Sequence, residues 1–258
     1  ARQRKGTWFD PVLVRALEAF ESDTLFWATL GTTDQLAQVA SLEPEDRVEM
    51  ANETRLDRVA TAFAKVIDAK SPYTARHSEG VAAIAVMLAK HMGHRADDIV
   101  VLHRAGLLHD IGKLGVSNAI LDKPAKLTDD EMGAMRRHTG YTLDILKRVR
   151  RFRAFADIAA AHHERLDGSG YHLGLDGDSL GPLARILAVA DVCEALSAER
   201  PYRKAMGVDE VFGVMRKMVG KALCPETFEA LRGTFTGIPK GPGMVAEQEG
   251  GVSMLVNP

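Results

Sequence analysis

The sequence predicts an all-α fold of the bundle type, and three observations support this prediction. Apolar residues recur at helical spacing in two stretches, Val81, Ile84, Ala85 and Leu88 in the first and Leu183, Ile186, Leu187 and Ala190 in the second. Thr128 followed by Glu131 matches a capping box, which predicts a helix that runs toward Leu146. No stretch alternates apolar and polar residues between turn-forming residues, as a half-buried strand would.

The chain is expected to have three regions. Residues 1–50 form a short helical N-terminal extension, residues 51–235 form the main domain, and residues 236–258 form a flexible tail or linker that is rich in glycine. Residues 6–17 and 220–231 both place a glycine and a proline ahead of a predicted helix. Two explanations stay open: a shared way of beginning a helix, or an extension that ends a preceding, related domain of a longer protein.

Composition narrows the classes of partner. The net charge of −2 gives no bulk attraction to nucleic acid or to a membrane, and no apolar run reaches the roughly 18–20 residues of a membrane span. Cys193 and Cys224 lie far apart in the sequence, which favours a reducing cytoplasm over a disulfide framework. The five cations within residues 147–153 are interpreted as a solvated helix end rather than a nucleic-acid site. A cytoplasmic protein with no nucleic-acid or membrane partner is therefore expected.

Seven ionisable residues stand on predicted helices or helix ends: His77, His109, Asp110, His138, His162, His163 and Asp191. Most of them share the apolar face of their helix, so they are expected to converge in the interior. Any one of these histidines alone is explained by a hydrogen-bonded core position. Burying five imidazoles and two carboxylates together is costly unless a positive charge organises them, and a divalent metal does so.

The number and spacing of these residues indicate more than one metal ion. A catalytic zinc typically takes three protein ligands, whereas seven are enough for two ions with a shared carboxylate. The doublets His109–Asp110 and His162–His163 place neighbouring ligands at a helix end, where both can turn toward one cluster.

Four segments resemble a known family. Residues 109–115 (HDIGKLG) are similar to the signature of HD-domain phosphohydrolases. Residues 162–171 (HHERLDGSGY), 190–205 (ADVCEALSAERPYRKA) and 71–78 (SPYTARHS) narrow the resemblance to the HD-GYP subfamily. The motifs occur in order over roughly residues 55–232, and four separate motifs make the match specific.

The resemblance implies a domain of about seven helices or more, with a metal centre that often holds iron or manganese. One ion would bind His77, His109, Asp110 and Asp191, and a second would bind His138, His162 and His163, with Asp110 as the bridge. Some members hold a third ion through a Glu four places before the first His. Tyr73 stands at that place here, so two ions are predicted.

The resemblance also implies hydrolysis of cyclic di-GMP to linear pGpG or GMP. A hydroxide held between the two ions, with Asp110 as the catalytic bridge, would attack phosphorus in line with the leaving 3′ oxygen. Lys113 lies four residues after His109 and is predicted to meet a phosphate oxygen; the alternative is a solvated helix residue. Gly112 would permit close approach of the substrate.

Three further polar residues have two interpretations each. Arg200 and Arg203 would clamp the second phosphate or the leaving group, or they would simply begin a basic helix. Asp167 would orient a ligand histidine, or it would cap a turn before Gly168.

The sequence departs from the family at the Gly-Tyr-Pro triplet, which reads Gly170-Tyr171-His172 here. Proline would stiffen this loop by fixing φ, and histidine does not. The loop is thought to serve docking of diguanylate cyclase domains, so the departure bears on the partner more than on the ligand set. His172 itself is interpreted as a surface histidine without a role.

Two other functions stay open beside the cyclic di-GMP phosphodiesterase. The same metal site would cut another nucleotide, such as a different cyclic dinucleotide. Alternatively, the domain would bind nucleotide or partner without turnover, as a signalling module. The resemblance further allows a homodimer, and the metal content together with a panel of substrates would separate these functions.

Overall fold

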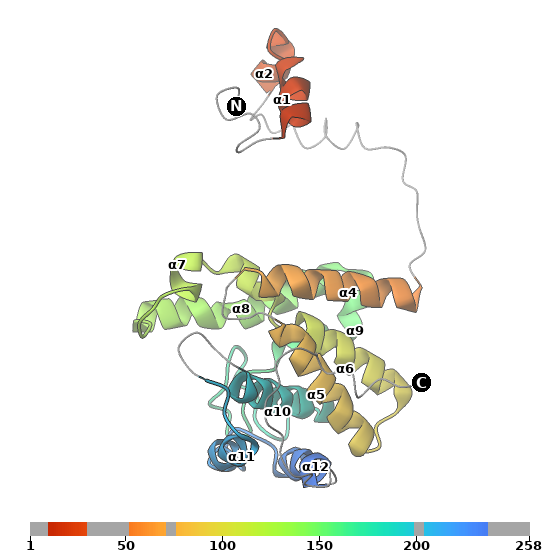
Figure 1. Ribbon diagram of the computed structural model, residues 1–258, viewed down its shortest axis with the longest axis vertical. Helices are drawn as coiled ribbons and strands as arrows, with labels where there is room; N and C mark the ends of the chain where they lie inside the picture. The colour runs from red at the N-terminus through yellow and green to blue at the C-terminus, as the bar shows by residue number, and fades with distance from the viewer. Residues whose placement is uncertain (1–9, 30–51, 71–75, 199–203, 237–258) are drawn as a thin grey trace. The chain divides into compact units, whose positions relative to one another are not determined.

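The computed structural model describes residues 10–29, 52–70, 76–198 and 204–236, which form two units (Figure 1). The first unit spans Ala1–Ala51 and contains α1 (Pro11–Glu18) and α2 (Thr24–Thr29). Pro11 begins α1, and Asp10 caps it by accepting hydrogen bonds from the backbone N–H groups of Val12 and Leu13.

The second unit, Asn52–Pro258, carries the rest of the described helices. They are α4 (Glu53–Asp68), α5 (His77–His91), α6 (Ala96–Leu108), α7 (Asn118–Leu121), α8 (Asp129–Arg148), α9 (Arg153–Ala160), α10 (Pro182–Ser197), α11 (Val208–Arg216) and α12 (Pro225–Thr236). Two 3₁₀ turns, η2 (Ile111–Gly115) and η3 (Arg150–Phe152), join them. The predicted all-α class is thereby confirmed, and the predicted tail lies outside the described residues apart from Thr236, the last residue of α12.

Helices α5, α6 and α10 form the centre of the second unit, α9 packs on α6, and α8 packs on α9 and on the η2 turn (Figure 1). Leu88, Leu102 and Leu187, one from each central helix, are fully buried. Small residues let α5 and α6 approach closely, because a Cβ at position 106 would lie 2.7 Å from Cα of Ala82. Helices α6 and α9 also contact α10, and η2, which follows α6, packs on α8.

Helix α8 begins as the sequence predicts. The Thr128 hydroxyl accepts from the backbone N–H of Glu131 (3.3 Å), and the Glu131 carboxylate accepts from the backbone N–H of Thr128 (2.8 Å). The helix runs two residues past Leu146, and its basic end is exposed, as predicted. Lys147 there pairs with Asp157 at 2.9 Å.

Arg104 ties α6 to α4 with a buried guanidinium. Its side chain is 8% exposed and donates to Asp57 Oδ1 and Glu53 Oε2, each at 2.7 Å. We expect Arg104→Met to lower the free energy of unfolding by about 1–3 kcal/mol, because charged hydrogen bonds are lost while both carboxylates stay accessible to water. Chemical denaturation measures this change.

Arg95→Met is the matched control for Arg104→Met. Arg95 faces Asp97 at 3.5 Å, but both side chains are more than four-fifths exposed, so water screens this pair. The control is expected to leave the denaturation midpoint unchanged. Equal midpoints for the two variants would contradict a stabilising role of the buried network.

Candidate metal centre

The seven residues singled out in the sequence come together in one cluster, some from helix ends and some from helix interiors. His77 is the first residue of α5, and Asp191 lies on α10. His109 and Asp110 directly follow α6, while His138 lies on α8. His162 and His163 follow Ala161, the C-cap of α9. All are buried except His163, whose side chain is 33% exposed.

The carboxylate of Asp110 lies between two groups of histidines. Its Oδ2 lies 3.3 Å from Nε2 of His109 and 3.7 Å from Nε2 of His77. Its Oδ1 lies 3.5 Å from Nε2 of His138 and 3.7 Å from Nε2 of His162. Each oxygen of this one carboxylate therefore faces a different pair of imidazoles.

Asp191 and His163 complete the two groups. Asp191 Oδ1 lies 3.3 Å from Nε2 of His77, and Asp191 Oδ2 lies 3.9 Å from Nδ1 of His163. The ligand atoms of His77, His109 and Asp191 lie within 4.8 Å of one another, and so do those of His138, His162 and His163. Both groups are compact enough to hold a metal ion.

Backbone carbonyls fix the orientation of three imidazoles. The Nδ1 atoms of His109, His138 and His162 lie 2.8, 2.6 and 2.7 Å from the carbonyl oxygen three residues earlier in the chain. Because the carbonyl is only an acceptor, Nδ1 donates, and the lone pair of Nε2 faces the cluster. The backbone thus orients three candidate ligand nitrogens toward the cluster before any ion is bound.

A different device orients His77. Its Nδ1 is hydrogen-bonded to the carboxylate of Glu194, which follows Asp191 by three residues on α10. Residues at this spacing share a helix face, so α10 supplies one carboxylate to the cluster and a second behind it. Sequence reasoning missed Glu194, although its spacing from Asp191 was a signal that could have found it.

Burial and charge set the protonation states in the cluster. Burial alone would raise the pKa of Asp110, but Lys113 and His109 outweigh it and hold that pKa well below the usual range. Burial lowers the pKa of His162 well below its ordinary value and that of His163 to about 4. Burial also opposes charging of His77, but hydrogen bonds to carboxylates raise its pKa to about 10. Ionised carboxylates beside the neutral imidazoles of His162 and His163 are a donor set suited to a divalent cation, which would displace the proton of His77 on binding.

Two buried atoms test whether a metal fits. Nε2 of His109 and Oδ1 of Asp110 have no hydrogen-bond partner within the part of the chain that the structure describes. A buried acceptor without a partner costs free energy, and here two point into one cluster. A cation among them removes this cost, so the residues present fit metal ions.

The other predicted site residues have different outcomes. Lys113 lies in η2 rather than on a continued α-helix, and its Nζ lies 2.5 Å from Asp110 Oδ2. The proposed role of Gly112 in substrate approach is wrong, because a Cβ there would lie 1.9 Å from the carbonyl oxygen of His138 on α8. Arg200, Arg203 and Tyr73 lie outside the described residues.

Two loop residues, Asp167 and His172, differ in how far the structure explains them. Asp167 Oδ1 accepts from the backbone N–H (3.0 Å) and the hydroxyl (2.6 Å) of Ser169, so this carboxylate caps a turn. The interpretation of His172 as a surface histidine without a role stays a prediction. His172 is half-buried, and its Nδ1 is shielded from solvent with no hydrogen-bond partner among the described residues.

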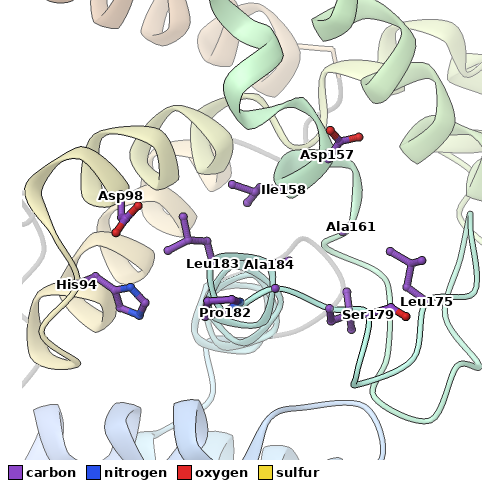
Figure 2. A pocket seen from close by; sticks show the side chains of 12 residues that line it. His94, Asp98, Asp157, Ile158, Ala161, Leu175, Ser179, Pro182, Leu183 and Ala184 are labelled. Carbon is purple, nitrogen blue, oxygen red and sulfur yellow. The ribbon is translucent and has the colours of Figure 1, made fainter.

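A separate pocket of about 370 Å³ lies at the start of α10 (Figure 2). His94 and Asp98 line it from the α6 side, and Leu183 and Ala184 line it from α10. None of the seven clustered residues lines this pocket, so α10 contributes separately to the pocket and to the metal centre. Across the described helices, none combines the length and hydropathy that crossing a membrane requires.

Known proteins resemble both the sequence and the fold. The HD domain family matches residues 61–226. The 3′3′-cGAMP-specific phosphodiesterase 3 of Vibrio cholerae is 44% identical over 92% of this chain and 51% of its own length. The cyclic di-GMP phosphodiesterase response regulator RpfG of Xanthomonas campestris is 36% identical over 69% of this chain and 48% of its own. The chain thus spans about half the length of the curated relatives it matches.

Solved structures of related proteins resemble the fold of this chain. The crystal structure of the cyclic GMP-AMP phosphodiesterase V-cGAP3 of V. cholerae has a TM-score of 0.50 and 41% identity, and the match covers 92% of this chain and 54% of that one. Bd1817 of Bdellovibrio bacteriovorus, an HD-GYP-type protein, has a TM-score of 0.55 at 17% identity over 72% and 65% of the two chains, a likeness of fold alone. The family match covers more than half of the chain and includes all seven clustered residues. The chain therefore belongs to the HD-domain family, as its His109–Asp110 motif predicts.

Proposed function

We propose that this domain is a metal-dependent phosphodiesterase that hydrolyses a cyclic dinucleotide. The observation that carries the proposal is the division of the cluster by Asp110, whose two oxygens face separate pairs of histidines. A carboxylate placed in this way is suited to bridge two ions. The names of the relatives in V. cholerae and X. campestris support the same class of substrate.

The proposed ligand set has two parts. One ion would bind His77, His109, Asp110 and Asp191, and the other would bind His138, His162 and His163 together with Asp110. Mixed imidazole and carboxylate ligands suit iron or manganese, and we propose one of these. When bound, divalent ions would lower the pKa of water and neutralise charge on the phosphoryl oxygens.

The chain supplies cations for the remaining charge of the substrate. Lys113 is 21% exposed and already lies against Asp110, so its ammonium is placed to meet a phosphate oxygen at the edge of the cluster. Arg200 and Arg203 remain proposed contacts to the second phosphate, on the motif alone. Lys113 acts as a point charge, whereas an arginine fork suits two phosphate oxygens at once.

Two cyclic dinucleotides are the leading substrates. The resemblance to the HD-GYP subfamily favours cyclic di-GMP, and RpfG carries that substrate in its name. The 3′3′-cGAMP phosphodiesterase of V. cholerae, which matches 92% of this chain, favours 3′3′-cGAMP instead. The two compounds share the scissile 3′–5′ phosphodiester and differ in one base, so the base-contacting walls of the site decide between them.

A panel of nucleotides tests the proposal. Protein reconstituted anaerobically with ferrous iron or manganese is expected to linearise cyclic di-GMP or 3′3′-cGAMP, followed by chromatography. Chelation is expected to lower turnover at least about a hundredfold, and added metal to restore it, because removing metal from the site takes away several kcal/mol of charge stabilisation. Metal and nucleotide bound without any hydrolysis would instead identify a binding module.

A further inference from the structure

The loop that follows the histidine pair is closed at its base. We call residues 168–175 the Tyr171 loop. The backbone N–H of Gly177 donates to the carbonyl of Leu166 (2.9 Å) below it, and Asp167 pairs with Asp176 as an isolated bridge. Compact loops with closed ends are held by contacts in their own interior. The structure places one carboxylate in that interior.

Glu164 is this interior carboxylate. It is 3% exposed, and its two oxygens accept one hydrogen bond each, from the backbone N–H of Leu173 at 2.7 Å and of Leu175 at 3.0 Å. Leu173 is 60% exposed, so burial of that side chain does not hold the loop there. Leu175 packs partly against the apolar cluster of Ala161, Leu180 and Ala184, whereas at Leu173 the hydrogen bond to Glu164 is the contact that holds the loop.

The loop is also packed directly on the segment that carries the ligands. The backbone N–H of Tyr171 donates to the carbonyl of His163 at 3.3 Å. A Cβ at Gly170 would lie 2.5 Å from Cα of Glu164, so only glycine allows this approach. Glu164 therefore fixes the loop against the same few residues that hold the candidate metal centre.

Tyr171 lies at the open side of that centre. Its ring centroid lies 4.9 Å from that of His163 and 6.3 Å from that of His138. His163 has the most exposed side chain of the seven clustered residues, so solvent reaches the cluster on this side. Arg136 of α8 lies over the Tyr171 ring at 5.4 Å and adds a cation to the same edge.

We propose that Glu164 is a positioning residue for substrate binding. Its buried carboxylate fixes the Tyr171 loop and thereby holds Tyr171 as the wall against which the nucleotide rests beside the metal centre. The proposal rests on the phosphodiesterase function proposed above and names the part of the chain that shapes its substrate site. A purely structural carboxylate would stabilise the fold without acting through Tyr171.

Hydrogen exchange tests the first half of the proposal without any turnover. In Glu164→Gln, the amide group of the side chain replaces one acceptor oxygen with a donor, so one backbone N–H loses its partner. The amides of Leu173 and Leu175 are expected to exchange at least about tenfold faster, which corresponds to about 1.4 kcal/mol, while the amides of α8 and α10 keep their protection.

Asp176→Asn is the matched control. Its exposed carboxylate accepts from the backbone N–H of Ser179 at 3.0 Å at the base of the same loop. This control is expected to leave the exchange of Leu173 and Leu175 unchanged. Unchanged protection in Glu164→Gln would overturn the proposal, whether or not the protein hydrolyses any nucleotide.

Kinetics test the second half, once the native protein has been shown to turn over a cyclic dinucleotide. Glu164→Gln and Tyr171→Leu are each expected to raise KM at least about tenfold with metal content unchanged, because both remove binding rather than chemistry. If Glu164 acts through Tyr171, the KM of the double variant is no higher than that of the more impaired single variant. Multiplied effects, or loss of metal in Glu164→Gln, would overturn the positioning role. Absence of turnover in the native protein would count against the phosphodiesterase and leave the exchange result to decide the loop.

Discussion

Asp110→Asn is expected to bind neither metal ion tightly and to lose hydrolysis by at least about a thousandfold, or some 4 kcal/mol of barrier. The physical reason is the shared position of this carboxylate. Its oxygens lie 3.3–3.7 Å from the Nε2 atoms of four histidines in two groups, so neutralising one side chain removes the anionic ligand from both. Metal analysis by mass spectrometry, beside a turnover assay, measures both effects.

One variant in each of the two groups of candidate ligands provides a comparison of metal content with Asp110→Asn. His77→Gln removes a nitrogen from the group that contains Asp191, and His163→Gln removes one from the group that contains His138. Each is expected to retain about one ion per chain, whereas Asp110→Asn retains none. If all three variants kept the same metal content, the division of the cluster into two sites by Asp110 would be wrong. Far-ultraviolet circular dichroism checks that each variant keeps its helices.

The clustering of the seven residues was predictable because local spacing encodes it. On α5, His77 lies on the same face as the buried Val81, and on α10, Asp191 lies on the same face as the buried Leu187. Such apolar faces turn toward the interior of the domain. The capping box at Thr128 likewise depends on residues three apart, and it begins α8 as predicted. Periodicity and caps are local signals, and the structure agrees with them.

The features that the sequence did not predict depend on contacts between distant segments. Glu164 looks like an ordinary surface acid in the sequence, yet it accepts from the loop nine to eleven residues away. The spacing of Glu194 from Asp191 gives its helix face, but not its partner His77, 117 residues away. Lys113 lies near Asp110 because α6 gives way to a 3₁₀ turn after His109, which no residue pattern indicated. The spacing of residues within one segment does not show which distant segment of the chain packs against it.

Gly112 shows this limit most clearly. It lies in η2, and its backbone N–H donates to the Thr142 hydroxyl at 3.0 Å, while that hydroxyl donates to the carbonyl of His109 at 2.8 Å. A Cβ at position 112 would lie 1.9 Å from the carbonyl oxygen of His138 and 2.6 Å from the backbone nitrogen of Thr142. The glycine therefore serves backbone packing of η2 on α8, two residues after Asp110.

Gly112→Ala is accordingly expected to lower the free energy of unfolding by about 3 kcal/mol or more, because the clash is with helix backbone that cannot move aside. For a domain of this size, Tm would fall by about 6–12 °C. The matched control is Gly133→Ala, whose added Cβ on the exposed side of α8 would have no neighbour within 4 Å. That control is expected to gain about 0.5–1 kcal/mol, since alanine favours a helix interior. Metal affinity should weaken in Gly112→Ala alone, because a displaced η2 carries Asp110 away from His138. Equal Tm values for the two variants, measured by calorimetry on metal-free protein, would show that η2 does not pack on α8 through this glycine.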